Sequence, residues 1–126
     1  MFERTGIALF GRQPFAKVNN QTLKRIIRRE FGSRASEVKQ KLKIETGETQ
    51  KVNNRIAAAI IKLADKDVNA IDDFTNINNN DFRDILMKAE YPRCVDLGFG
   101  EIKNGTKMKQ IYLADWNDYS NWLNKK

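Results

Sequence analysis

The chain has 126 residues, of which 40% are hydrophobic and 31% charged, and its formal net charge is +7. This composition is that of an ordinary globular protein and excludes a fibrous repeat or wholesale disorder. Because the sequence contains no histidine, the Ser-His-Asp triad, the Cys-His pair and every histidine-containing metal site are excluded as well. The length predicts one compact domain over residues 1–126.

Cys94 is the only cysteine, so no disulfide can form within the chain. Small secreted domains often contain disulfides, and this count therefore favours a reducing compartment. No apolar stretch reaches the length of a signal-peptide core or the roughly 20 residues of a membrane span. We expect a cytoplasmic protein that does not contact membranes.

Residues 1–18 are predicted to form an extended arm or an edge strand. Ile7 and Leu9 are apolar and two residues apart, as in a strand, while Gly11 and Pro14 interrupt any longer element. The first helix is then predicted over about residues 21–31.

Two neighbouring asparagines, Asn19 and Asn20, stand where the cap of this first helix belongs. Its apolar residues recur at helical spacing, and Gly32 supplies the flexible position that ends it. The helix therefore has an apolar stripe facing the protein interior.

Further short helices are predicted up to residue 92, and together with the first they form a helical core over residues 19–92. One spans about 34–43, and the next, over 52–65, has an apolar stripe so broad that we expect it to be central. Two more complete a set of about five: one carries Val68, Ile71 and Phe74, and one runs from about residue 81 until Pro92 stops it.

The last part of the chain permits two interpretations. Apolar residues alternate with polar ones or glycine over residues 95–99, and Asn104-Gly105 is a strong turn signal. These features predict a hairpin at 94–113, followed by a terminal helix from Asp115.

The competing interpretation of residues 93–126 is one long helix after Thr106, because apolar residues from Met108 to Leu123 also fit helical spacing. We favour the hairpin. The predicted fold class is thus mainly α, or α+β if the hairpin forms.

Positive charge is concentrated in the first half of the chain. Residues 1–62 contain 14 Lys and Arg against 5 Asp and Glu, whereas residues 63–126 contain 9 against 11. Such asymmetry indicates a nucleic acid or an acidic protein surface as partner, although a solvated lysine-rich surface also explains it.

The predicted helix 21–31 carries four cations on the side opposite its apolar stripe. A surface of this kind can contact several phosphates at once, and a guanidinium can bind one with two hydrogen bonds. The candidate nucleic-acid-binding residues are Lys24, Arg25, Arg28, Arg29, Arg34, Lys39, Lys41 and Lys43. We find no base-reading motif.

The hypothesis that follows is a small non-enzymatic binding protein that contacts nucleic acid or a nucleoprotein complex. The alternative is a protein–protein interaction module, such as an inhibitor, an antitoxin-like protein or an immunity protein, which acts by occlusion. No catalytic residue, metal ligand or cofactor is assigned, and the oligomeric state stays open.

A remote third hypothesis is a magnesium-dependent nuclease. Asp96 followed by Glu101 and Lys103 loosely resembles the signature of restriction-type nucleases, in which two carboxylates hold the metal and the lysine assists the attacking water. The interval between Asp96 and Glu101 is short for two neighbouring strands, and Glu-x-Lys arises often by chance in such a chain.

Overall fold

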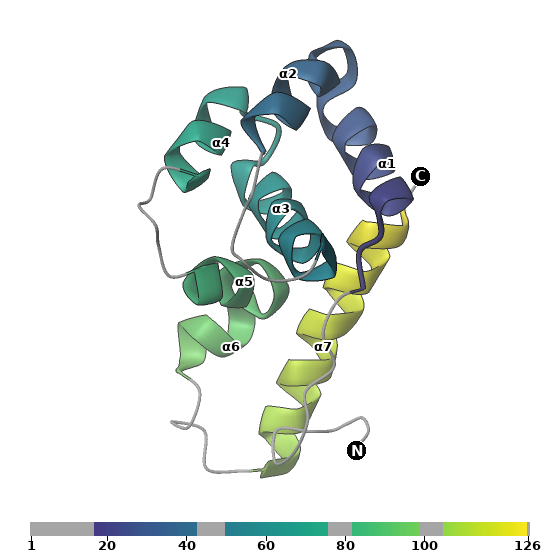
Figure 1. Cartoon of the computed structure of the whole chain (residues 1–126). Coiled ribbons are helices and arrows are strands. Elements are labelled where there is room, and N and C mark those ends of the chain that lie inside the picture. Colours follow the sequence, from purple (N-terminus) through teal and green to yellow (C-terminus); the bar gives the residue numbers. More distant parts are fainter. Residues whose placement is uncertain (1–16, 43–49, 76–81, 99–104, 126) are drawn as a thin grey trace.

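The computed structural model describes residues 17–42, 50–75, 82–98 and 105–125. All regular secondary structure in these ranges is helical (Figure 1). The elements are α1 (Asn20–Phe31), the 3₁₀ turn η2 (Gly32–Arg34), α2 (Ala35–Lys41), α3 (Gln50–Ala64), α4 (Val68–Thr75), α5 (Phe82–Glu90), α6 (Pro92–Leu97) and α7 (Gly105–Asn124). The prediction of a mainly α fold is confirmed.

Helix α1 forms as its sequence indicates. The Asn19 side chain accepts a hydrogen bond from the Thr22 amide at 2.8 Å, so it satisfies one of the free amides of the first turn. The helix ends at Gly32, whose φ of 52° lies in the left-handed region. Ile26 and Ile27 are buried and hold α1 against the rest of the protein.

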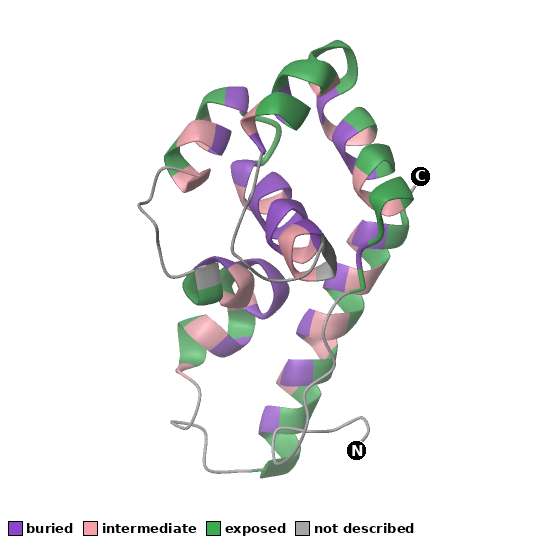
Figure 2. Cartoon of the chain, in the orientation of Figure 1, coloured by how far each residue is buried: buried purple, intermediate pink, exposed green. Residues whose placement is uncertain are grey.

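Helix α3 lies in the middle of the molecule, with α1, α4 and α5 packed around it (Figure 1). Every residue from Ile56 to Ile61 is buried, and Figure 2 shows buried positions along most of the helix. The alanines within this stretch have no long side chain, so neighbouring helices can approach closely. The predicted central helix is confirmed, with bounds at Gln50 and Ala64.

Helix α7 is the longest element and joins two clusters of buried residues. The larger cluster surrounds α3 and includes Tyr119 and Leu123 from the second half of α7. The smaller cluster contains Tyr91 and Cys94 together with Met108 and Tyr112 from the first half of α7. Its buried side chains therefore recur at helical spacing along the whole length of α7.

The predicted hairpin at 94–113 is wrong. Residues 94–97 belong to α6, and residues 105–113 form the first half of α7, so the long-helix interpretation applies. The predicted helix start at Asp115 is wrong too, because Asp115 lies within α7 and is buried. The helical spacing of the apolar residues determines the structure here, and the turn signal at Asn104-Gly105 does not. Asn104 itself lies outside the described residues.

Pro92 has a different role from the predicted one. It occupies the first turn of α6, where the backbone amides have no partner within the helix and the missing amide hydrogen of proline costs nothing. The sequence predicts only that Pro92 ends α5. The predicted arm or edge strand spans residues 1–18. Residues 1–16 lie outside the described part of the chain, and residues 17 and 18 have no regular secondary structure. No helix in the described ranges is long and apolar enough to cross a membrane.

Candidate nucleic-acid interface

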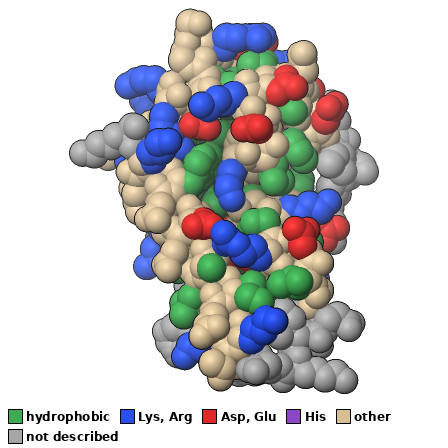
Figure 3. All heavy atoms as spheres, turned by 180° about the vertical axis from the view of Figure 1, so that it is seen from behind, with side chains coloured by type: hydrophobic (Ala, Val, Ile, Leu, Met, Phe, Trp, Pro, Cys, Tyr) green, Lys and Arg blue, Asp and Glu red, His purple; other side chains and the backbone are tan. Residues whose placement is uncertain are grey.

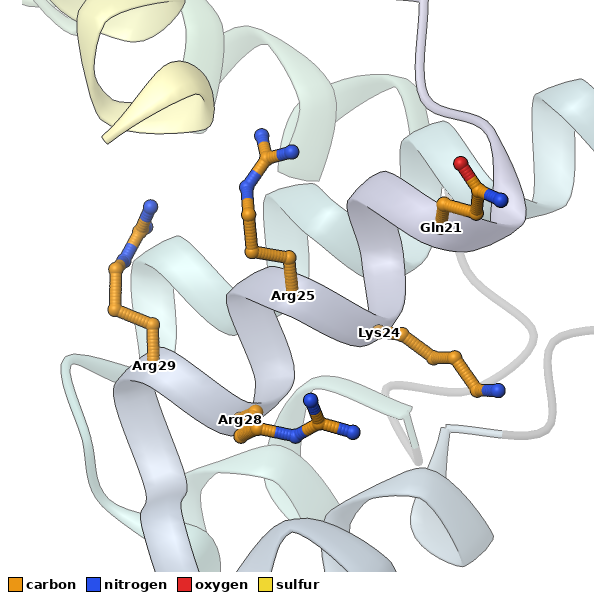
Figure 4. Close-up of a pocket in the computed structure, with 5 residues that line it drawn as sticks. All are labelled: Gln21, Lys24, Arg25, Arg28 and Arg29. Carbon is orange, nitrogen blue, oxygen red and sulfur yellow. The ribbon is translucent and has the colours of Figure 1, made fainter. Parts of the chain in front are cut away.

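An open groove of about 540 Å³ lies along α1, and five residues of this helix line it (Figure 4). Gln21, Arg25 and Arg29 are four residues apart and form what we call the inner row, whereas Lys24 and Arg28 form the outer row. Arg25 and Arg29 point toward the end of α7, and Lys24 and Arg28 point away from it (Figure 4).

The two arginines of the inner row bind the C-terminal end of α7. Nη2 of Arg25 donates a hydrogen bond to the carbonyl oxygen of Leu123 at 2.7 Å, and Nη1 of Arg29 donates to that of Lys125. The last carbonyls of a helix lack internal partners and carry a partial negative charge. Arg25 and Arg29 therefore satisfy these carbonyls with the sign of charge that the helix end favours.

Arg29 is held by further contacts. Its Nε lies 3.0 Å from the Glu30 carboxylate, and its guanidinium lies 5.1 Å from the centre of the Trp122 ring. Only 11% of its side chain is exposed. Arg29 is thus mainly a structural contact between α1 and α7, whereas Arg25 is an exposed residue that reaches across to the same helix end.

Two candidate cations on the following elements are in ion pairs. Arg34 binds Glu37 within the same turn, at 2.9 Å, and both side chains are about half exposed. Lys41 lies 2.7 Å from the Asp72 carboxylate and joins α2 to α4. The exposed Arg34–Glu37 pair contributes little free energy, whereas the Lys41–Asp72 pair is partly buried.

The outer row consists of Lys24 and Arg28, which are exposed and make no ion pair or side-chain hydrogen bond with the described part of the chain. Lys39 on α2 shares this property. Lys43 lies outside the described residues. The seven described candidates are thus divided between internal contacts and free positive charge, and the free charge on α1 lies along one side of the groove (Figure 4).

The face of the molecule that lies behind the view of Figure 1 is mixed in charge. Figure 3 shows acidic and basic side chains interspersed there, with apolar atoms between them. Along the sequence, residues 20–41 contain seven Lys and Arg against two Glu. Positive charge is therefore concentrated on α1, η2 and α2.

The sequence gives no signal of a buried ion pair and of several contacts at helix ends. Arg55 binds the fully buried Glu90 through two hydrogen bonds, at 2.9 and 2.7 Å. Lys62 donates to the carbonyl of Ala89 at 2.8 Å, near the end of α5, and burial lowers the pKa of its amine. Asp115 accepts from the amides of α6. The partners are 20 or more residues apart in sequence, so local spacing carries no signal of them.

The described residues include no group of three Asp, Glu or Cys side chains placed to hold a metal ion. Asp96 is exposed on α6, while Glu101 and Lys103 lie outside the described part of the chain. Cys94 is buried, and burial raises the pKa of its thiol to about 12, which keeps it protonated and unreactive near neutral pH.

No protein-family model matches the chain, and neither the curated proteins nor the solved structures gave a match. What the site can bind is therefore inferred from its own residues alone. The groove on α1 offers hydrogen-bond donors and positive charge, which are the groups that recognise phosphate.

Proposed function

We propose that this protein is a binding module that contacts the phosphate backbone of a nucleic acid through the groove on α1. The observation that carries the proposal is the outer row: Lys24 and Arg28 are exposed, unpaired within the described residues, and on one side of the same groove. Lys39, exposed on the adjacent helix α2, adds a further free charge.

The spacing of the outer row suits a nucleic-acid strand. Lys24 and Arg28 are four residues apart, which is about 6 Å along the helix axis. One strand of a duplex presents a phosphate every ~3.4 Å of its axis, so the two side chains span about two phosphates. Arg28 can bind one of them with two hydrogen bonds, and Lys24 supplies a point charge.

Contacts of this kind bind the backbone and carry no information about base sequence. The proposed module therefore binds unrelated sequences with similar affinity. The excess of positive charge on α1 and α2 also attracts a polyanion over a distance of about one Debye length.

The test is a charge reversal in the outer row, measured by fluorescence anisotropy with a labelled DNA duplex of arbitrary sequence. Arg28→Glu is expected to lower the affinity about tenfold, because a charge-assisted hydrogen bond is lost and a repulsion is added. Lys88→Glu, an equal reversal at an exposed position on α5, is the matched control and is expected to change the affinity less than about twofold.

Equal effects of the two reversals would contradict the proposal, because the net charge alone would then explain binding. A further comparison uses polyglutamate as competitor. If polyglutamate displaced the protein as well as unlabelled duplex does, the groove would belong to an acidic protein partner instead.

A further inference from the structure

The groove that we propose for the phosphate backbone shares Arg25 with the contact that holds the end of α7. The outer row points away from α7, and Arg25 points toward it (Figure 4). A phosphate bound between Lys24 and Arg28 therefore lies on the side of the groove opposite to the carbonyl of Leu123, which Arg25 binds.

The two possible partners of Arg25 differ in strength. The carbonyl oxygen of Leu123 is neutral, with the fractional charge of a helix end, whereas a phosphate oxygen carries a full charge. Both hydrogen bonds have an ionised donor, but only the phosphate adds the attraction between two full opposite charges. A phosphate in the groove thus competes effectively for the Arg25 guanidinium.

Arg29 differs from Arg25 in this respect. It is nearly buried, pairs with Glu30 and lies against the Trp122 ring, so several contacts must break before it moves. Arg25 has one described hydrogen bond, that to Leu123, and is exposed. Arg25 is therefore the exchangeable contact, and Arg29 keeps α7 attached.

We propose that Arg25 exchanges between Leu123 at the end of α7 and a phosphate of the bound nucleic acid, so that ligand binding loosens the last turn of α7. This inference rests on the proposed function. Because coupling between two sites is reciprocal, firm attachment of the α7 end also opposes binding, and Arg25 acts as an autoinhibitory contact.

The experiment measures amide hydrogen exchange in the last turn of α7, with and without a saturating DNA duplex. In the wild-type protein the duplex is expected to accelerate exchange over residues 121–125 up to about tenfold, because the carbonyl of Leu123 loses its charged partner and the turn frays. The two variants compared with it are Arg25→Ala and Lys24→Ala.

Arg25→Ala is expected to exchange fast in this turn without any ligand, and the duplex then causes no further acceleration. Its affinity for the duplex falls, and the slope of log affinity against log salt decreases by about 0.9, as for one lost phosphate contact. Lys24→Ala is the neighbouring control. Its slope of log affinity against log salt also decreases by about 0.9, but exchange in the free protein stays slow and still accelerates on binding.

Unchanged exchange in wild-type α7 at saturating duplex would overturn the inference, whatever Arg25→Ala does to affinity. The proposed function would still stand if Lys24→Ala and Arg28→Glu weakened binding in that case. If none of these variants altered binding, the proposed function itself would be wrong, and the inference would be wrong with it.

Discussion

Cys94 and Tyr112 both lie in the smaller buried cluster, and their environment keeps them protonated. Burial is the main cause that raises the pKa of each group to about 12, from ordinary values of 9.0 for the thiol and 10.0 for the phenol. The pKa values of Tyr91 and Tyr119 rise in the same direction for the same reason. In the unfolded chain these groups ionise at their ordinary pH.

Stability is therefore expected to fall in alkaline solution. Between about pH 9 and pH 12 the unfolded state has lost protons that the folded state retains, and each such group then lowers the free energy of unfolding by up to ~1.4 kcal/mol per pH unit. The lowered pKa of Lys62 acts in the opposite direction below about pH 10.5, but it is one group against several. Urea midpoints measured at about pH 8 and pH 11 check this, and a midpoint that stays constant or rises would contradict it.

Three helix ends in the described residues bind side chains that come from other helices. Asp115 of α7 accepts hydrogen bonds from the amides of Arg93 and Cys94, at 3.3 and 3.0 Å, in the first turn of α6. Lys62 binds a carbonyl near the end of α5, and Arg25 binds one at the end of α7. A carboxylate at the start of a helix and cations at the ends match the helix dipole in each case.

The cap that Asp115 gives to α6 can be tested against its neighbour. Asp115→Ala leaves two amides of α6 without their acceptor and is expected to cost about 2–3 kcal/mol of unfolding free energy. Asp118→Ala removes an exposed carboxylate that binds only the Arg93 guanidinium among the described residues, so little change is expected. Urea unfolding followed by circular dichroism measures both, and equal losses would rule out a special role for the cap.

The elements differ in how far the sequence predicts them. Helices α1 and α3 are predicted within about two residues, because a cap and a long apolar stripe are local signals. Helix α6 is not predicted, since its start depends on Asp115, more than 20 residues later in the chain. The sequence also fails to decide between hairpin and helix around residue 110, where the buried stripe of α7 forms only against α5 and α6.

At the scale of the whole molecule, the cations of the first half of the chain occupy two kinds of environment. Some cations of the first half hold helices together, as Arg29 does with α7 and Lys41 with Asp72. The outer row makes no ion pair or side-chain hydrogen bond within the described residues, as the proposed contact with phosphates requires. A helical wheel predicts that Lys24 and Arg28 are exposed, but the internal use of Arg25 and Arg29 depends on carbonyls almost 100 residues away, which no pattern in α1 reveals.

The salt dependence of binding to a DNA duplex tests the central claim most directly. Each neutralised phosphate contributes about −0.9 to the slope of log affinity against log salt. We expect a slope of about −1.8 if Lys24 and Arg28 alone bind phosphates, and about −3.6 if Lys39 and Arg25 join them. Between about 50 and 200 mM salt the affinity then falls ~12- to 150-fold. An affinity that does not change over this range, or no binding at the lowest salt, would contradict the account.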